Sequence, residues 1–73
     1  MPKAVLLPKS LQEKVASYPE YKMGVHRLSV VLRNGDLIRN VHIAWNEQVV
    51  LIEGQSDIPF STEEIVDVVN SVF

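Results

Sequence analysis

The fold is decided by residues 25–45, which read VHRLSVVLRNGDLIRNVHIAW. The first part of this stretch alternates, and one parity is mainly apolar, as in a strand with one face against a core. The residues of that parity are His26, Leu28, Val30 and Leu32. Asn34-Gly35 follows directly and is a strong hairpin signal, because both residues tolerate the positive φ of a type I′ turn. The stretch therefore predicts a strand over 25–33, a tight turn and a returning strand over 36–45.

The returning strand does not keep a single parity. Its later apolar residues share one face; these are Val41, Ile43 and Trp45. Ile38 has the opposite parity, and a β-bulge near Arg39-Asn40 would let it point inward together with the later set. We therefore expect a bend in this strand, as where one strand serves two sheets of a small barrel. Trp45 ends the strand, and we expect it to be buried with the other members.

Two further strands are predicted after the hairpin. Asn46 marks a second tight turn, and residues 47–53 form a third long strand. Its four consecutive apolar residues indicate burial on both sides, or contact of one face with another subunit. Residues 58–60 predict a short strand, which Pro59 restricts to an edge or a strand end.

The N-terminal part predicts an arm and a short helix. Residues 1–9 contain two prolines and are expected to be an irregular arm. A helix is predicted over 10–18, because the Ser10 hydroxyl can cap a backbone amide and Glu13 can reach back to the Ser10 amide. Pro19 ends this helix.

The C-terminal residues 61–73 fit two structures. Ser61 and Glu64 form a capping box, which predicts a helical turn over 61–64. The residues that follow are dense in valine and isoleucine, and we expect a short strand over about 65–70. Their apolar spacing also fits a helical stripe, so a full C-terminal helix is the alternative.

Length and composition bound the class of protein. The chain has 73 residues and is expected to form a single domain, 1–73. A domain this small buries only about 60% of its unfolded surface, and without cysteine it has no disulfide to stabilise it, so self-association is expected. A net charge of −2 excludes a generally basic nucleic-acid binder. No apolar run approaches the ~20 residues of a membrane span, and the lack of cysteine fits a cytoplasmic protein.

This order of elements, over residues 10–70, resembles that of the SH3-like and Sm-like small β-barrels. The closest local likenesses are VVLRNGD at 30–36 and IPFSTEEIVDV at 58–68. The chain also looks similar to small uncharacterised bacterial proteins. The resemblance implies a mainly β, five-stranded barrel over 25–70 preceded by the short helix. The alternative is an α+β fold, a three-stranded antiparallel meander with N- and C-terminal helices. The chain departs from Sm proteins at AWNEQVV, 44–50, where an Asp-x-x-Asn-type nucleotide pocket is missing.

The sequence carries no catalytic constellation. His26 lies on a core face and reads as a buried, hydrogen-bonded histidine rather than a metal ligand or general base, and His42 is expected to face outward. Two imidazoles alone make a poor zinc site. The acidic residues Glu63, Glu64 and Asp67 fit the first turn of a helix, where they complement its dipole. We expect no enzyme activity, no metal, no cofactor and no small-molecule ligand.

Two surfaces are candidate binding sites. Apolar residues on both parities predict a protein interface or self-association surface, made of Val25, Val31, Val49, Val50, Leu51 and Ile52. A possible basic patch consists of Lys22, Arg27, Arg33 and Arg39. These charges fit a solvated face that protects a sheet edge better than they fit a nucleic-acid site. The expected function is a non-catalytic interaction or self-assembling module, and the alternative is a weak RNA- or DNA-binding Sm-like module.

Overall fold

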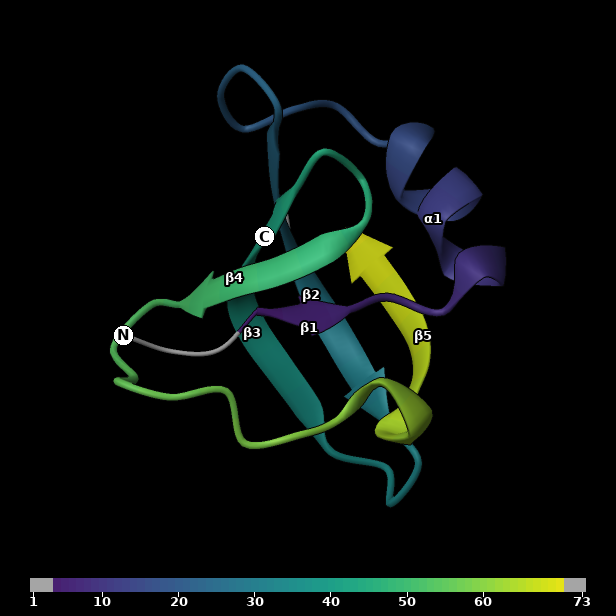
Figure 1. Cartoon of the computed structure of the whole chain (residues 1–73), viewed down its shortest axis with the longest axis vertical. Coiled ribbons are helices and arrows are strands. Elements are labelled where there is room, and N and C mark those ends of the chain that lie inside the picture. The colour runs from purple at the N-terminus through teal and green to yellow at the C-terminus, as the bar shows by residue number, and fades with distance from the viewer. Residues whose placement is uncertain (1–3, 71–73) are drawn as a thin grey trace.

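One antiparallel sheet of five strands forms most of the molecule (Figure 1). The computed structural model describes residues 4–70. In the order in which they lie side by side, the strands are β1 (Val5–Leu6), β4 (Gln48–Ile52), β3 (Leu37–Ala44), β2 (Val25–Leu32) and β5 (Ile65–Asn70). The sheet curls into a half-barrel, so the expectation of a mainly β, five-stranded, barrel-like fold is confirmed. One short helix, α1 (Lys9–Ala16), lies against β5, and a single 3-10 turn, η1 (Thr62–Glu64), precedes β5.

The predicted hairpin between β2 and β3 is present, but its turn has a different geometry. Only Gly35 of the Asn34-Gly35 pair has a positive φ, +94°. The Asn34 side chain accepts the backbone N–H of Asp36 at 2.9 Å, and the Gly35 N–H bonds to the Leu32 carbonyl. This side-chain bond holds Asn34 outside the left-handed region, as in the three-residue hairpin loops that end on a glycine.

The turn with two positive φ angles lies between β3 and β4 instead. Trp45 and Asn46 have φ of +56° and +64°. The Glu47 N–H closes this turn on the Ala44 carbonyl at 3.1 Å. Two consecutive positive φ angles are typical of a type I′ hairpin turn. Because the strand ends at Ala44, Trp45 no longer follows its alternation.

Three β-bulges bend the sheet. In β3, Arg39 and Asn40 lie opposite the single residue Ser29, and Asn40 has a φ of +57°, so the bulge predicted at this place is confirmed. In β4, the extra residue is Val50. In β5, it is Val66. Each bulge adds one residue to one strand of a pair. The residues after it therefore point to the opposite face from the one that strict alternation predicts.

The bulges explain why the apolar residues of these strands do not alternate. The inward-facing residues come three apart instead of two apart, in the pairs Ile38 and Val41, Val49 and Ile52, and Ile65 and Val68. The core also takes residues outside these three pairs, namely Leu7, Val15, Leu28, Val30, Leu32, Ile43, Ile58 and Phe60. A spacing of three is also that of a helix face, so the helix-like stripe in the C-terminal segment comes from a bulged strand.

The N-terminal region differs from the expected arm and capped helix. The stretch 1–9 contains β1, whose register is fixed by Val5 opposite Val49. The helix begins at Lys9, after Pro8, and no side chain caps it. Ser10 does not cap the helix because it lies inside it, and Pro8, which has no N–H to leave unpaired, stands at the N-cap position. Among residues 4–70, no helix is long and apolar enough to cross a membrane.

The helix is attached to the sheet by one ion pair and its apolar face. The Lys14 Nζ donates to Asp67 Oδ1 on β5 at 2.6 Å. This contact raises the pKa of Lys14 and lowers that of Asp67. Val15, fully buried in the core, supplies the apolar contact.

Over residues 61–70 the prediction of a helical turn followed by a short strand is confirmed, and the alternative of a C-terminal helix is wrong. The capping box at Ser61 and Glu64 is formed, η1 follows it, and β5 begins at Ile65. Residues 58–60 are not a strand. Pro59 has no N–H to pair, and the Asp57 carboxylate takes the Ile58 N–H at 2.8 Å, so this segment is held by side chains.

The bulge in β5 predicts that substitutions at two valines of this strand change the stability by different amounts. Val68 is 0% exposed and Val66 is 49% exposed. Val68→Ala is expected to lower the free energy of unfolding by about 2 kcal/mol, because two buried methyl groups and their packing are lost. Val66→Ala is expected to lower it by less than about 1 kcal/mol. Equilibrium urea unfolding measures both, and equal losses would contradict the bulge.

Candidate interaction surface

The outer face of the half-barrel carries a row of paired side chains across three strands, two of them polar. Arg27 of β2 lies opposite His42 of β3, and His42 lies opposite Leu51 of β4. His42 points away from the core, as its parity predicts, but it is only 8% exposed because other side chains cover it. The His42 side chain is therefore packed within the surface and does not project freely into solvent.

Tyr21 covers this row from the connection between α1 and β2. Its ring meets the His42 ring edge-on at 5.6 Å, and the Arg27 guanidinium lies 4.4 Å from the ring centre. The backbone holds it in place, since the Tyr21 N–H donates to the Val25 carbonyl at 2.8 Å. Lys22 reaches the same ring at 5.6 Å. Such cation–π contacts fix the positions of both cations beside an aromatic surface.

Glu53 completes the cluster, which we call the Tyr21 cluster: Tyr21, Arg27, His42 and Glu53. One carboxylate oxygen, Oε2, lies 2.7 Å from His42 Nε2 and 3.4 Å from Arg27 Nη1. The hydrogen bond from His42 and the nearby Arg27 lower the pKa of Glu53. The arrangement orients the imidazole and holds the cluster together. Within residues 4–70, no group of three His, Cys, Asp or Glu side chains is placed to hold a metal ion.

Next to the cluster, two large apolar side chains stand out from the molecule. Met23 is 91% exposed and Trp45 is 69% exposed, which overturns the expected burial of Trp45. The reason is the turn, because Trp45 leaves the strand with a positive φ. Its N–H donates to the Gly24 carbonyl at 2.7 Å, and its ring lies over Gly24, where a Cβ would come within 2.9 Å of ring atoms. We call Tyr21, Met23 and Trp45 the aromatic end of the molecule.

The residues expected at an interface are divided between the core and the surface. Val49 and Ile52 are buried in the core, because the bulge at Val50 turns both inward. Leu51 is exposed next to His42. The remaining three, Val25, Val31 and Val50, are half-buried.

The four basic residues do not form one patch. Lys22 and Arg27 both contact the Tyr21 ring at one end of β2. Arg33 follows the other end of β2 and donates to the Glu63 carbonyl at 2.9 Å. Six residues of a strand separate Arg27 from Arg33 by about 20 Å. Arg39 is exposed in the bulge of β3.

His26 is placed as the sequence predicts. It is buried in the core, and its Nε2 lies 2.9 Å from the Tyr18 carbonyl. The other ring nitrogen, Nδ1, has no partner among the described residues. His26 therefore ties the segment after α1 to the sheet.

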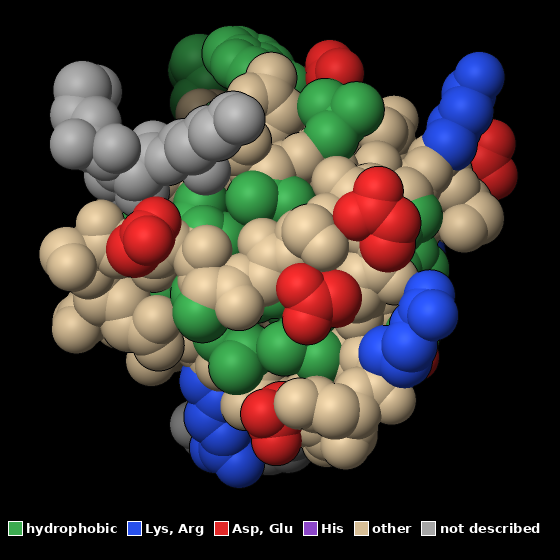
Figure 2. All heavy atoms as spheres, turned by 60° about the horizontal axis from the view of Figure 1, so that its bottom comes forward, with side chains coloured by type: hydrophobic (Ala, Val, Ile, Leu, Met, Phe, Trp, Pro, Cys, Tyr) green, Lys and Arg blue, Asp and Glu red, His purple; other side chains and the backbone are tan. Residues whose placement is uncertain are grey.

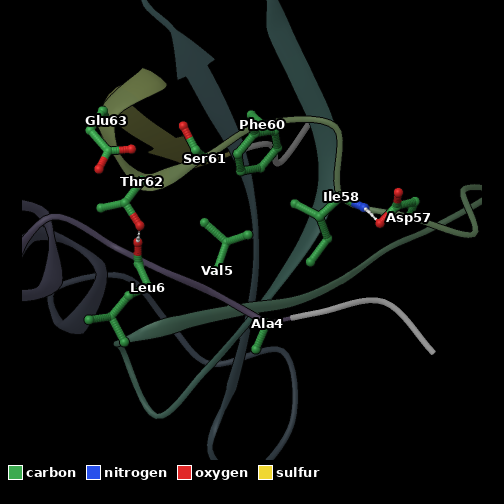
Figure 3. Close-up of a pocket in the computed structure, with 9 residues that line it drawn as sticks. All are labelled: Ala4, Val5, Leu6, Asp57, Ile58, Phe60, Ser61, Thr62 and Glu63. Carbon is green, nitrogen blue, oxygen red and sulfur yellow. Dashed lines mark hydrogen bonds between the residues drawn. The ribbon is translucent and has the colours of Figure 1, made fainter.

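A groove opens at the other end of the molecule, between β1 and the segment that leads to η1 (Figure 3). Its volume is about 420 Å³. The apolar side chains of Val5, Ile58 and Phe60 lie in the middle, with Asp57 at one end and Glu63 at the other. Figure 2, in which the lower side of Figure 1 faces the reader, shows hydrophobic side chains gathered in the middle of that side with acidic ones beside them.

Sequence reasoning did not identify the aromatic end or the groove as sites. Met23 offered one usable signal, an apolar residue in a polar connection directly before Gly24. The groove had none, because it depends on how β1 and a non-strand segment pass each other.

The lowered pKa of Glu53 predicts a specific sensitivity to acid. Its contribution to stability is fully present above the ordinary carboxyl pKa of 4.5 and is lost as pH falls through the lower folded value. Glu53→Gln is therefore expected to weaken the fall of the melting temperature below pH 4.5. Glu13→Gln, on the exposed side of α1, is the control and keeps the wild-type profile. Identical acid profiles for Glu53→Gln and wild type would show that the contact adds no stability.

Comparison with known proteins does not place this chain in a family. The chain matches no family model, no curated protein and no solved structure. A function therefore has to be argued from the chain's own surfaces.

Proposed function

We propose that this chain is a non-catalytic interaction module that associates with a second copy of itself through its aromatic end. The observation that carries this proposal is the exposure of Met23 and Trp45 on the two turns at the end of the molecule that also carries the Tyr21 cluster. Exposed apolar groups of this size are costly in water unless a partner covers them. Trp, Tyr, Met and Arg are the residue types enriched in protein interfaces.

The rigidity of this surface supports a binding role. Trp45 is held by its backbone bond to Gly24, and Tyr21 by its bond to Val25. A surface that is already ordered loses little conformational entropy when it binds.

The charges around the aromatic end favour a second copy as the partner. Exposed Glu20 and Lys22 lie on either side of Tyr21 in the chain, and exposed Glu47 follows the turn that carries Trp45. A two-fold interface brings the same patch of both copies together, so a patch with both signs of charge can complement itself. Self-association would also bury apolar surface that a domain of this size cannot bury alone.

Three finer assignments belong to the same proposal. The strand order, the short helix and the 3-10 turn before the last strand support an SH3-like or Sm-like barrel. The lack of cysteine supports a cytoplasmic location. The separation of the basic residues, together with the contacts of Arg27 and Arg33 to acidic side chain or backbone groups, favours protein over nucleic acid as the partner.

Self-association is tested by sedimentation velocity over a wide range of concentration. We expect a reversible dimer whose dissociation constant rises about 30-fold in Trp45→Ala, the size of a typical interface hot spot, and also rises in Met23→Gln. Met23→Gln keeps the side-chain length, and a residue this exposed has little part in the fold. Leu37→Gln, an exposed leucine beside the distant hairpin turn, is the matched control. A wild-type chain that stays monomeric at the highest concentration, or equal effects in all variants, would refute the proposal.

A further inference from the structure

The groove between β1 and η1 has an open backbone edge. β1 is the outermost strand of the sheet on this side. The Leu7 N–H donates to the Glu47 carbonyl of the neighbouring strand at 2.7 Å. Because successive residues of a strand direct their backbone groups to opposite sides, the groups of Leu6 point away from β4. The Leu6 carbonyl confirms this direction, since it accepts the Thr62 hydroxyl at 2.6 Å across the groove.

The Leu6 N–H is left without a partner among the described residues. None of the turn, loop or side-chain hydrogen bonds of residues 4–70 involves it, and its direction away from β4 excludes a bond within the sheet. Segment 58–60 runs along the far side of the groove but does not form a strand beside β1. An exposed edge donor of this kind is a place where another extended chain can add to the sheet.

The walls of the groove define what such a chain would carry. Val5, Ile58 and Phe60 give an apolar middle, which suits one branched apolar side chain. Asp57 and Glu63 stand at its two ends. The pKa of Glu63 is lowered by bonds to its own backbone and to Ser61, with a smaller contribution from Arg33. Arg33 offsets part of the negative charge at that end, whereas Asp57 contacts only the Ile58 N–H among the interactions of the described residues.

We propose that this groove binds an extended peptide segment in which one apolar residue lies between basic residues. The Leu6 N–H donates to a carbonyl of the peptide, the apolar side chain enters between Val5 and Phe60, and the basic side chains face Asp57 and Glu63. The charge of the two ends selects a basic segment over an acidic one. In Figure 1 the segment that leads to η1 lies on the opposite side of β1 and β4 from the α1–β2 connection and the β3–β4 turn, and the groove shares no lining residue with the aromatic end, so we expect this binding to be independent of self-association.

The test uses the full chain, labelled with ¹⁵N, and blocked pentapeptides. The probe is Lys-Thr-Ile-Thr-Lys, and the controls are Glu-Thr-Ile-Thr-Glu and Lys-Thr-Ser-Thr-Lys. We expect the Lys-Thr-Ile-Thr-Lys peptide to shift the amide signals of Leu6 and Thr62 and to slow hydrogen exchange at Leu6. Reversal of two partly exposed ion pairs is expected to weaken binding about tenfold for the acidic peptide. The serine peptide is expected to bind more weakly as well, because the apolar middle of the groove stays empty.

Two variants separate the parts of the proposal. Asp57→Asn combined with Glu63→Gln is expected to remove the preference for the basic peptide; asparagine can still accept the Ile58 N–H. Glu20→Gln, an exposed carboxylate at the other end, is the charge-matched control and keeps the preference. Leu6→Pro removes the edge donor at a strand position where proline is tolerated, so binding is lost while the thermal unfolding transition remains.

Three results would overturn the proposal. They are the absence of any shift with the basic peptide at saturating concentration, equal affinity for the acidic peptide, and shifts confined to Tyr21 and Trp45. The same titration on Met23→Gln, which disrupts the proposed dimer, keeps the two proposals apart. Failure of self-association leaves the groove titration unchanged, and failure of the groove titration leaves the dimer unchanged.

Discussion

The fold depends on three residues that interrupt the pairing of its strands. A flat five-stranded sheet of this length could not enclose a core, because the apolar side chains on one of its faces would point in parallel and would not converge. The extra residues at Asn40, Val50 and Val66 bend β3, β4 and β5, and bring their apolar side chains inward three residues apart. The sheet curls far enough for Leu7, Val15 and Phe60, which lie outside the long strands, to complete the core.

The same bending decides which residues are left for the surface. Because Val49 and Ile52 both turn inward, the apolar run in β4 is mostly core, with Leu51 left outside. The two ends of the half-barrel then differ in chemistry. One end has the tight turn that carries Trp45, beside Tyr21 and its cationic neighbours. At the other end, a segment that cannot pair as a strand passes β1 and leaves an apolar groove between two carboxylates.

Much of the fold could be predicted from the sequence, because alternation, glycine and asparagine are local signals. The hairpin, the bulge near Arg39-Asn40 and the strand after Ser61 are examples. The two-residue strand β1 and the position of Trp45 could not be predicted. β1 is too short to show a pattern and exists only through its pairing with β4, and Trp45 leaves its strand through two positive φ angles that the local sequence does not signal strongly. The binding surfaces depend on such tertiary placements.

The bulged pairing is tested most directly by cross-strand nuclear Overhauser effects in solution. The account predicts backbone contacts between Ile43 and Val49 and between His42 and Leu51, with no partner for Val50. It predicts the same pattern around Val66, with Leu32 facing Ile65 and Val31 facing Asp67. Regular one-to-one pairing through Val50 and Val66, or contacts of helical spacing over residues 65–70, would contradict it.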